Sequence, residues 1–512
     1  MLVKTFGSAV FGINATTITV EVNISIGATF HLVGLPDNAV KESQQRINAA
    51  LKNNKLDFPG KKFVINMAPA DIRKEGSAYD LTLAIGILAA SGQIISEELE
   101  KYVIMGELSL DGSLKPIKGA LPIAIKAREE GFKGFILPKQ NAREAAVVNN
   151  LAVYGAENII EVVDFLNKKK QLEPLHVNTR EEFNKGTKSY DTDFSDVRGQ
   201  ENVKRAMEIA AAGNHNIIMI GPPGAGKTML AKRVASILPP FTLQEALETT
   251  KIHSVAGKIE KDTSLMTLRP FRSPHHTISD VALVGGGAYP QPGEISLAHN
   301  GVLFLDELPE FQRSVLEVMR QPLEDRVITI SRAKFSVEYP ASFMLVASMN
   351  PCPCGYYNHP EKDCVCSPGI RQKYLNKISG PLLDRIDIHI EVVPVPFEKL
   401  SGKEALENSK TIRERVSKAR AIQQERFAGL PAIYNNAQMN TKLIRKYCQL
   451  DTTGSQLIKT AMEKVGLSAR AYDRILKVSR TIADLEQSVD IQPHHLAEAI
   501  QYRSLDRDSW GT

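Results

Sequence analysis

Hydrophobic and polar positions alternate in blocks that predict two α/β regions followed by a helical region. In residues 1–167, strand-like runs such as TITVEVNI and KKFVINMA alternate with helix-like runs such as YDLTLAIGILAASG, which indicates one α/β domain. Residues 168–193 are polar with little apolar periodicity, and we expect a linker there. Residues 194–395 contain NIIMIG, GVLFLDE and FMLVASMN, which are typical of buried parallel strands. Residues 396–512 have apolar positions at three- and four-residue spacing, which predicts a helical lid or bundle.

Composition changes this picture little. The chain has 512 residues, of which 43% are hydrophobic and 24% charged, as is usual for globular proteins and unlike disordered or membrane chains. The apolar run at residues 81–90 is about half of the ~20 residues that a spanning helix needs. We therefore expect a cytoplasmic protein without a membrane partner. The net charge is only +5, so any nucleic-acid surface must come from local placement of Lys and Arg.

A glycine-rich motif marks a phosphate-binding loop. The sequence GPPGAGKT follows the apolar strand NIIMI and precedes the helix-like run MLAKRVASIL, which is the context of a P-loop. In such a loop, backbone N–H groups surround the phosphates of ATP, the lysine neutralises the β- and γ-phosphates, and the hydroxyl binds Mg²⁺. The predicted ATP-binding residues are Gly221, Pro222, Pro223, Gly224, Ala225, Gly226, Lys227 and Thr228.

Two adjacent acidic residues follow another buried strand. GVLFLDE places Asp306 and Glu307 at the carboxyl end of a four-residue apolar run. We expect Asp306 to hold Mg²⁺ together with Thr228. Glu307 is the expected group that polarises the attacking water, because that role needs a carboxylate within hydrogen-bond reach of it.

These motifs resemble those of AAA+ ATPases, and the resemblance extends to other positions. FSDVRGQ at residues 194–200 is similar to the segment that packs near the adenine in that family. Asn350 matches the sensor-1 position, and Arg385 in GPLLDRIDIHIEV matches the arginine finger of the subgroup with magnesium chelatase motors and MCM helicases. Arg470 lies where sensor 2 is expected, with Arg474 as the alternative.

The resemblance implies a ring. An arginine finger acts in trans on the γ-phosphate of a neighbouring subunit, and head-to-tail contacts that close give cyclic symmetry. We therefore expect a homo-hexamer. The residues alone leave a second interpretation open, in which these arginines only pair with Asp384 or Asp473.

Residues 269–301 form a Gly-, Pro- and His-rich stretch that resembles the helix-2 insert of magnesium-chelatase-like proteins. His275 and His276 leave a metal site open, although adjacent histidines need further ligands to bind one ion. Hydrogen bonds that fix the loop are the alternative.

Residues 326–348 predict two strands joined by a turn, directly before Asn350. They resemble the pre-sensor-1 hairpin of MCM-type rings, whose basic tip enters the central channel. Arg332 and Lys334 at this tip are the predicted DNA contacts, with phosphates as the sequence-independent ligand. A solvated hairpin tip is the alternative.

Four of the five cysteines lie in one short segment, NPCPCGYYNHPEKDCVC. Cys352, Cys354, Cys364 and Cys366 form two C-x-C pairs, and four thiolates around Zn²⁺ make a closed structural site in a reducing compartment. Free thiols and a redox switch remain open, as does replacement of one sulfur by His359.

The N-terminal domain resembles the proteolytic domain of Lon-type proteases, through KEGSAYDLTLAIGILAASG and MGELSLDGSLKPIKGALPIAIKAREEG. The positions of the family's Ser-Lys dyad correspond to Ala78 and Leu121, and Ser77 is one place away. Without a base, a serine hydroxyl is a poor nucleophile. We expect this Lon-protease-like fold (ribosomal S5 domain 2-like) to be catalytically inactive.

Taken together, these sections resemble the ComM/YifB family over almost the whole chain. The resemblance implies an ATP-dependent hexameric helicase that promotes branch migration of DNA in homologous recombination and natural transformation. It also implies single-stranded and branched double-stranded DNA as partners, together with recombination proteins, and ATP, Mg²⁺ and Zn²⁺ as cofactors. The alternative from another class is a motor that acts on a protein partner, as a chelatase subunit or an unfoldase.

Overall fold

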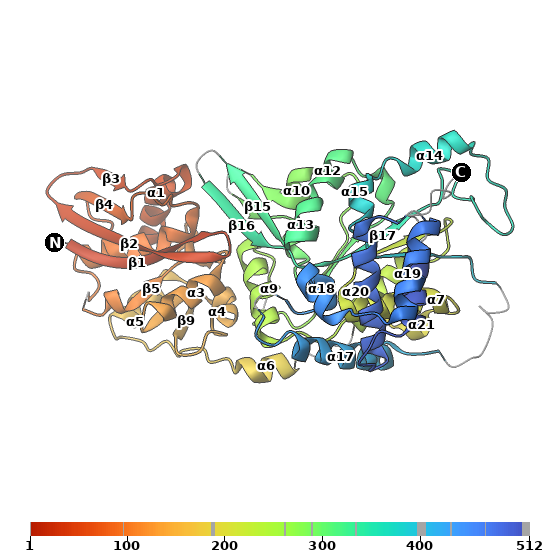
Figure 1. The fold of residues 1–512 in the computed structure, drawn as a ribbon. Coiled ribbons are helices and arrows are strands. Elements are labelled where there is room, and N and C mark those ends of the chain that lie inside the picture. Colours follow the sequence, from red (N-terminus) through yellow and green to blue (C-terminus); the bar gives the residue numbers. More distant parts are fainter. Residues whose placement is uncertain are drawn as a thin grey trace. The chain divides into compact units, whose positions relative to one another are not determined.

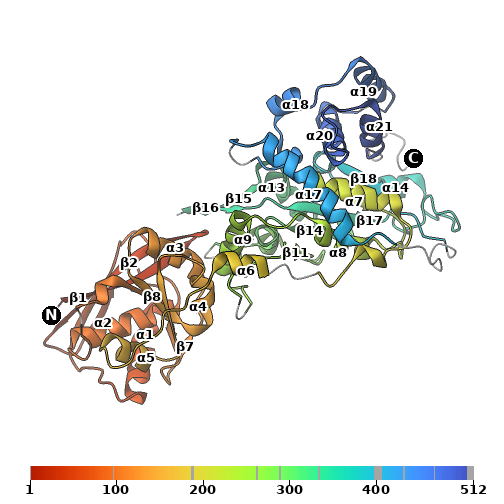
Figure 2. The same ribbon diagram turned by 90° about the horizontal axis from the view of Figure 1, so that it is seen from below.

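The computed structural model describes residues 2–95, 97–185, 190–260, 263–287, 290–332, 335–396, 406–430, 433–465 and 467–503. The chain divides into two compact units, the first formed by residues 1–187 and 243–267 and the second by residues 188–242 and 268–512 (Figures 1 and 2). Helix α9 (Leu243–Ala256) therefore belongs to the first unit, although its sequence lies within the range expected for the ATPase core.

The first unit is built on a seven-stranded mixed sheet with the order β3-β4-β2-β1-β5-β8-β9. Alternation in β2 sends Ile18, Val20 and Val22 into the core, where all three are fully buried. Helix α2 is buried along its whole length, which agrees with its continuous apolar sequence. The strands are β1 (Leu2–Phe11), β2 (Asn14–Ser25), β3 (Phe30–Val33), β4 (Lys62–Ala68), β5 (Tyr102–Ile104), β8 (Gly134–Pro138) and β9 (Ala152–Ala156), with the separate pair β6 (Glu107–Leu108) and β7 (Leu114–Lys115).

Besides α9, this unit has six α-helices and two short 3₁₀ helices among its described residues. They are α1 (Asn38–Asn53), α2 (Asp80–Ala90), α3 (Ala120–Glu129), α4 (Lys139–Ala145), α5 (Ile159–Leu166), α6 (Thr179–Lys185), η1 (Ser77–Tyr79) and η2 (Leu99–Lys101). Helix α6 lies within the segment expected to be a linker. In both units, no helix among the described residues is long and apolar enough to cross a bilayer.

The second unit contains a five-stranded parallel sheet with the order β11-β14-β17-β10-β18. Ile220 at the end of β10 is level with Met349 of β17, and Leu305 at the end of β14 is level with Ala347. The residues that follow β10, β14 and β17 therefore meet at one edge of the sheet. The strands are β10 (Ile217–Ile220), β11 (Phe271–Arg272), β14 (Val302–Leu305), β17 (Met344–Met349) and β18 (Ile388–Glu391), with the hairpins β12 (Gly285–Gly286)–β13 (Gln291–Pro292) and β15 (Val327–Arg332)–β16 (Phe335–Pro340).

Helices surround this sheet and continue to the C-terminal end of the described chain (Figure 2). The helices before residue 400 are η3 (Phe194–Asp196), α7 (Glu201–Gly213), α8 (Lys227–Ile237), α10 (Asp280–Val284), α11 (Glu294–Leu297), η4 (Leu308–Glu310), α12 (Arg313–Val318), α13 (Arg320–Asp325), α14 (Pro368–Leu375) and α15 (Gly380–Leu383). Those that follow are α17 (Ser409–Arg426), η5 (Asn436–Gln438), α18 (Thr441–Tyr447), α19 (Thr452–Val465), α20 (Ala469–Leu485) and α21 (Pro493–Gln501). Apolar residues of these later helices share one core with α7, α8 and the sheet strands.

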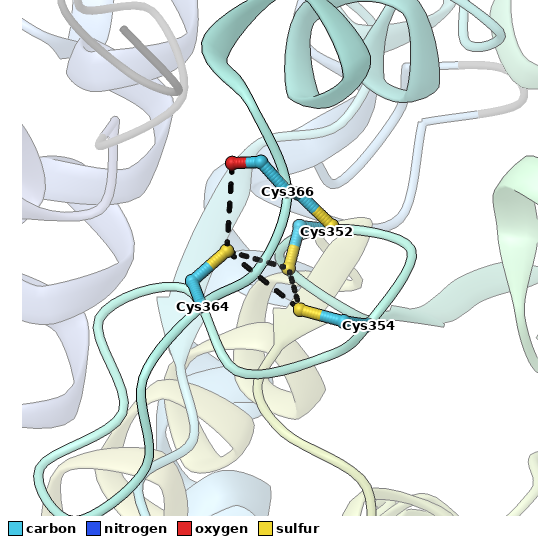
Figure 3. Close-up of side chains that lie close together, drawn as sticks. All are labelled: Cys352, Cys354, Cys364 and Cys366. Carbon is cyan, nitrogen blue, oxygen red and sulfur yellow. Dashed lines mark hydrogen bonds between the residues drawn. The ribbon is translucent and has the colours of Figure 1, made fainter.

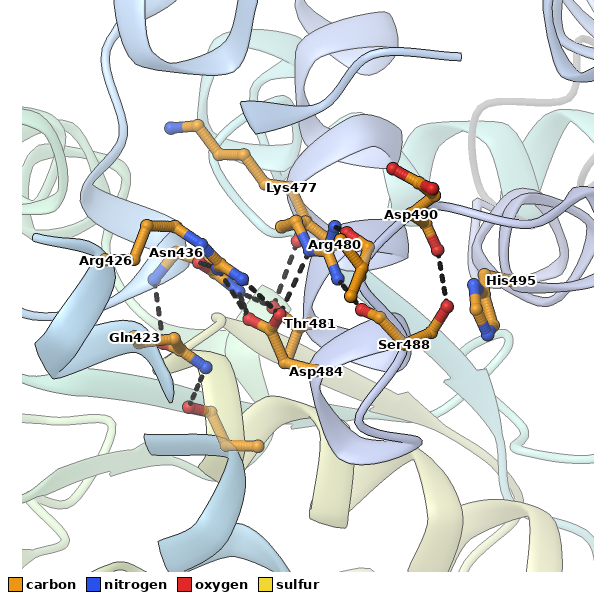
Figure 4. A network of polar contacts seen from close by, with 12 residues as sticks. Gln423, Arg426, Asn436, Lys477, Arg480, Thr481, Asp484, Ser488, Asp490 and His495 are labelled. Atoms are coloured by element: carbon orange, nitrogen blue, oxygen red, sulfur yellow. Dashed lines mark hydrogen bonds and ion pairs between the residues drawn. The ribbon is translucent and has the colours of Figure 1, made fainter. Parts of the chain in front are cut away.

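A buried carboxylate joins α17 to α20 inside this helical region (Figure 4). Asp484 is 1% exposed and accepts hydrogen bonds from Arg426 at 2.5 and 2.7 Å. Arg480 donates to the same carboxylate at 3.0 Å, and the Asn436 amide at 2.8 Å. Because a buried charge is tolerated only when it is paired and hydrogen-bonded, this network fixes the relative positions of the two helices.

Candidate nucleotide site and cysteine cluster

The P-loop connects strand β10, which lies between β17 and β18 in the sheet, to helix α8. Gly224 and Gly226 have φ angles of +79° and +88°, a left-handed conformation that glycine adopts without steric cost. Lys227 begins α8, and its Nζ donates hydrogen bonds to the carbonyl oxygens of Gly221 at 2.7 Å and Pro222 at 2.9 Å. The loop and its lysine thus form one connected unit at the carboxyl end of the strand.

Lys227 also contacts the residue expected to be sensor 1. Its Nζ donates to Oδ1 of Asn350 at 3.1 Å, across 123 positions of sequence. Burial lowers the pKa of the Lys227 ammonium, an effect that the carboxylates of Asp306 and Glu307 partly offset. Lys227 therefore lies near Asp306, the predicted Mg²⁺ ligand, and near Glu307, which is expected to polarise the attacking water.

Thr228 and Asp306 are in direct contact. The Thr228 hydroxyl donates to Asp306 Oδ2 at 2.7 Å. The other oxygen, Oδ1, accepts from the hydroxyl of Ser348 and from the Glu307 backbone amide. Hydroxyl and carboxylate oxygens are the ligands that Mg²⁺ prefers, so this pair fits the ion.

Ser348 is a site residue that the sequence reasoning missed. It lies fully buried in β17, where its hydroxyl orients the carboxylate of Asp306. The sequence does contain one indication of this role, a single serine within the apolar run MLVASM. A serine in a buried strand indicates a polar neighbour, because a buried hydroxyl requires a hydrogen-bond partner.

Glu307 has an unusual backbone conformation. Its φ of +54° lies in the left-handed region, which is uncommon for residues other than glycine and concentrates at functional sites. The side chain is 56% exposed, and its Oε2 lies 3.7 Å from Nδ1 of His276. The His275 imidazole instead contacts the Thr277 hydroxyl at 2.9 Å. Within the described residues, the two histidines are not part of a group of three or more side chains suited to a metal ion.

A cavity of about 410 Å³ opens beside Glu307 and Asn350. Its other lining residues come from η4, from the cysteine-rich loop, from α14 and from the residues just after α14, and they are Glu310, Pro353, Ile370, Lys373, Tyr374 and Lys377. The cavity beside Glu307 and Asn350 is therefore bordered by the segment that carries the cysteines.

The structure places the predicted arginines in ion pairs within the chain. Arg385 is largely buried, and its Nη2 lies 2.6 Å from Glu324. Arg470 is 63% exposed and lies 3.6 Å from Asp384, one of the partners that the sequence left open. Among the described contacts, neither arginine touches Lys227, Asp306 or Glu307.

The hairpin predicted before Asn350 is present. Strands β15 and β16 pair antiparallel from Val327 opposite Pro340 to Arg332 opposite Phe335. The side chain of Arg332 and the whole of Lys334 lie outside the described residues.

The four clustered cysteines converge at one point (Figure 3). The Sγ atom of Cys352 lies 3.3 Å from that of Cys354 and 3.7 Å from that of Cys364, and the last two are 3.6 Å apart. The four ligand atoms, including Sγ of Cys366, all lie within 4.8 Å of one another. Tetrahedral Zn²⁺ with Zn–S bonds of ~2.3 Å requires S···S separations of about 3.8 Å, so this arrangement fits the ion.

Two other features bear on this cluster. The S···S separations exceed the ~2.05 Å of a disulfide, and all four thiols are free. His359 Nδ1 accepts hydrogen bonds from the backbone amides of Glu361 and Lys362, and this histidine is not in the metal-suited group of the described chain. The fifth cysteine, Cys448, lies outside this cluster at the end of α18, and burial raises the pKa of its thiol to about 12.

The residues of the protease comparison lie in the first unit. Ser77 donates its hydroxyl hydrogen bond to the carboxylate of Glu107. Leu121 is fully buried in α3. Lys74 is also fully buried, and its Nζ donates to the carbonyl oxygen of Pro69 rather than to Ser77. Within the described contacts, the Ser77 hydroxyl therefore has a carboxylate as its partner and no lysine.

Family models match three successive parts of the chain. The model of the magnesium chelatase subunit ChlI matches residues 193–400, a second model of this subunit matches residues 20–141, and the model of its C-terminal region matches residues 406–503. Together with the P-loop site, these matches define a magnesium-chelatase-like AAA+ protein, a class that implies ATPase activity with ATP and Mg²⁺.

Relatives that align over almost the whole chain identify the family within this class. The competence protein ComM of Haemophilus influenzae is 46% identical over 505 residues, which cover 98% of this chain and 97% of the relative. The YifB protein of Escherichia coli is 44% identical over 507 residues, or 98% and 96% of the two chains. The chain belongs to the ComM/YifB family, as the sequence motifs predicted. Lon protease 2 of Bacillus subtilis is 32% identical over 159 residues, 28% of this chain and 27% of that protein, in agreement with the Lon-like motifs.

Proposed function

We propose that the protein is an ATP-dependent hexameric DNA helicase or translocase that promotes branch migration in homologous recombination and natural transformation. The observation that carries its motor function is the convergence of Lys227, Thr228, Asp306 and Asn350 at one edge of the parallel sheet. The full-length similarity to a protein named competence protein ComM supports the biological role. We place the protein in the cytoplasm.

The contacts of the site suggest a role for each side chain. Lys227 binds the β- and γ-phosphates of ATP, and Asn350, which already contacts the lysine, holds the γ-phosphate or the attacking water. Glu307 is partly exposed at the cavity and polarises that water. Thr228 and Asp306 would hold Mg²⁺, which neutralises phosphate charge when bound.

Arg385 and Arg470 complete the proposed site. For Arg385 to reach the γ-phosphate of a neighbouring subunit, it must exchange its ion pair with Glu324 for the phosphate. Such an exchange makes assembly of the ring a condition for fast hydrolysis, because the finger supplies charge in trans. Arg470 is exposed, and its ion pair with Asp384 has a separation of 3.6 Å. Because surface ion pairs contribute little energy, this pair hardly opposes movement of Arg470 toward a nucleotide.

We assign DNA binding to the β15–β16 hairpin. In a hexamer, each subunit would contribute Arg332 and Lys334 to a central channel. Cations at this position bind phosphates without regard to sequence, as a translocating motor requires. We further propose that the four cysteines hold one Zn²⁺, because their sulfur separations fit a tetrahedral thiolate site.

A motor that acts on a protein partner is the second candidate. It is favoured by the family-model matches to a magnesium chelatase subunit. The two candidates differ in the ligand that should stimulate hydrolysis, which is DNA in the first and a protein in the second.

ATP hydrolysis and junction movement provide the test. The parent chain should hydrolyse ATP faster with single-stranded or forked DNA and should move a branched DNA junction. Lys227→Ala should abolish both activities, whereas the matched control Lys232→Ala, an exposed lysine on the same helix, should retain them. If DNA does not stimulate hydrolysis and Lys227→Ala moves the junction as well as the parent does, the helicase proposal is wrong.

A further inference from the structure

The side chain of Arg385 is held within its own chain. It is only 10% exposed, its Nη2 lies 2.6 Å from Oε1 of Glu324, and its Nη1 donates to the carbonyl oxygen of Pro381 at 2.6 Å. The buried Nε of Arg385 has no hydrogen-bond partner among the described residues. Because a buried donor without a partner is unfavourable, the arginine is only partly satisfied in this position.

Glu324 holds the arginine from a different helix. Its side chain is 48% exposed and lies on α13, whereas Arg385 follows the end of α15. A second contact joins the same two helices, because Arg320 at the start of α13 donates to the hydroxyl of Ser379, which precedes α15, at 3.2 Å. Release of Arg385 therefore requires the ion pair with Glu324 to break while the other contact can keep the helices together.

Helix α13 leads directly into the β15–β16 hairpin (Figure 1). Only Arg326, with a φ of +60°, lies between the helix and β15. The Arg326 carbonyl oxygen accepts from the backbone amide of Ala341 at 2.8 Å, and its Nη1 donates to the carbonyl oxygen of Phe343 at 3.1 Å. The base of the hairpin is thus fixed at Arg326, so a force on the hairpin acts on the end of α13 that carries Glu324.

We propose that Glu324 is a positioning residue that withholds Arg385 from the neighbouring subunit until DNA binds the hairpin. This inference rests on the proposed function, in which Arg385 is the arginine finger and the hairpin contacts DNA. Glu324 acts through Arg385 and touches no reacting group. Because only a released arginine can act in trans, the rate of hydrolysis without DNA follows the released fraction, and DNA raises that fraction by moving α13.

The test compares Glu324→Gln with Asp325→Asn in the full chain. Glu324→Gln retains the size of the side chain and removes its charge. Asp325→Asn removes the same charge from the next position of α13, which is exposed and is in none of the described ion pairs. A partly exposed hydrogen-bonded pair corresponds to about threefold to tenfold in the released fraction. We expect Glu324→Gln to raise kcat without DNA by this factor, with less than about twofold change in ATP affinity and with a smaller stimulation by single-stranded DNA. Asp325→Asn should match the parent in all three.

A double variant tests whether the effect passes through Arg385. Glu324→Gln combined with Arg385→Ala should hydrolyse ATP no faster than Arg385→Ala alone, and an increase that persists without Arg385 would overturn the inference. A parent-like rate of Glu324→Gln without DNA, or a rate with DNA below that of the parent, would overturn it as well. A parent chain that DNA does not stimulate would overturn the proposed function together with this inference, whereas a stimulated parent with an unchanged Glu324→Gln variant would overturn the inference alone.

Discussion

Arg474 and Arg470 lie one turn apart on α20 in contrasting environments. Arg474 Nη1 is 2.9 Å from Oδ1 of Asp387, and the two side chains are 17% and 1% exposed. Arg470 is 63% exposed and 3.6 Å from Asp384, which is 31% exposed. Arg474→Ala and Arg470→Ala therefore remove the same group from a buried pair and from a surface pair.

The surroundings of Asp387 set the expected loss of stability. In Arg474→Ala, the carboxylate stays buried and keeps the Asn216 backbone amide at 2.9 Å, with His215 Nδ1 at 3.7 Å. Breaking a buried pair costs about 3 to 5 kcal/mol, and the remaining partners favour the lower figure. Arg470→Ala should cost about 0 to 1 kcal/mol, because surface pairs contribute little.

The pair also predicts a response to acid. Burial alone would raise the pKa of Asp387, but Arg474, His215 and the Asn216 amide hold it well below its usual range. Its contribution to stability is therefore present above the unfolded-state pKa of about 3.9 and is lost as the pH falls toward the lower folded-state value.

Urea unfolding followed by far-ultraviolet circular dichroism measures these effects in the full chain. We expect the free energy of unfolding of Arg474→Ala to fall by about 3 kcal/mol at pH 7, with a smaller loss below pH ~4, where the parent also weakens. If Arg474→Ala and Arg470→Ala unfold at the same urea concentration, the buried pair does not stabilise the fold and our reasoning is wrong.

The remaining predictions concern other parts of the chain. Cys364→Ser with Cys366→Ser should lower the zinc content from about one ion per chain, as measured by mass spectrometry, whereas Cys448→Ser should not; equal zinc in all chains would exclude the site. The double variant should also weaken DNA binding or ring assembly more than ATP binding, and an equal loss of both would mean that the cluster only holds the core. Burial raises the pKa of Glu75 to about 7, so the stability of the parent should fall as the pH rises from about 4.3 to about 7, and Glu75→Gln should flatten this part of a urea-unfolding profile. Ser348→Ala should raise the Mg²⁺ concentration needed for half-maximal ATPase activity by about tenfold, because it removes an orienting hydrogen bond from a proposed ligand; an unchanged Mg²⁺ titration would contradict that role.

The parts of the site that sequence reasoning identified are those with strong local signals. The P-loop motif and the two acidic residues each follow an apolar run, and parallel strands place such residues at one edge of the sheet. The contact between Thr228 and Asp306 agrees with this reasoning. The cysteine pattern likewise indicated a tetrahedral thiolate site, and the structure brings these sulfurs together.

Other residues carried no signal that local sequence could interpret. Ser348 orients Asp306 from a neighbouring strand, and Tyr374 borders the same cavity as Asn350 from a helix 24 positions later. The arginine positions matched family motifs, but the ion pair between Arg385 and Glu324 spans 61 positions and depends on how α13 and α15 pack. Such an ion pair forms only when folding brings its two distant residues together. The spacing of the residues in the sequence therefore does not predict it.

The sequence by itself determined the alternation of strand-like and helix-like runs, the phosphate-binding motif and the family of this protein. Apolar periodicity and glycine placement are local properties, which hold wherever the segment lies in the fold. Tertiary structure alone decided that α9 joins the first unit, that the cysteine loop packs on Pro223, and that Asn350 contacts Lys227. These outcomes follow from the packing of segments distant in the chain, where shape and hydrogen-bond satisfaction select one arrangement from many that the same local patterns permit.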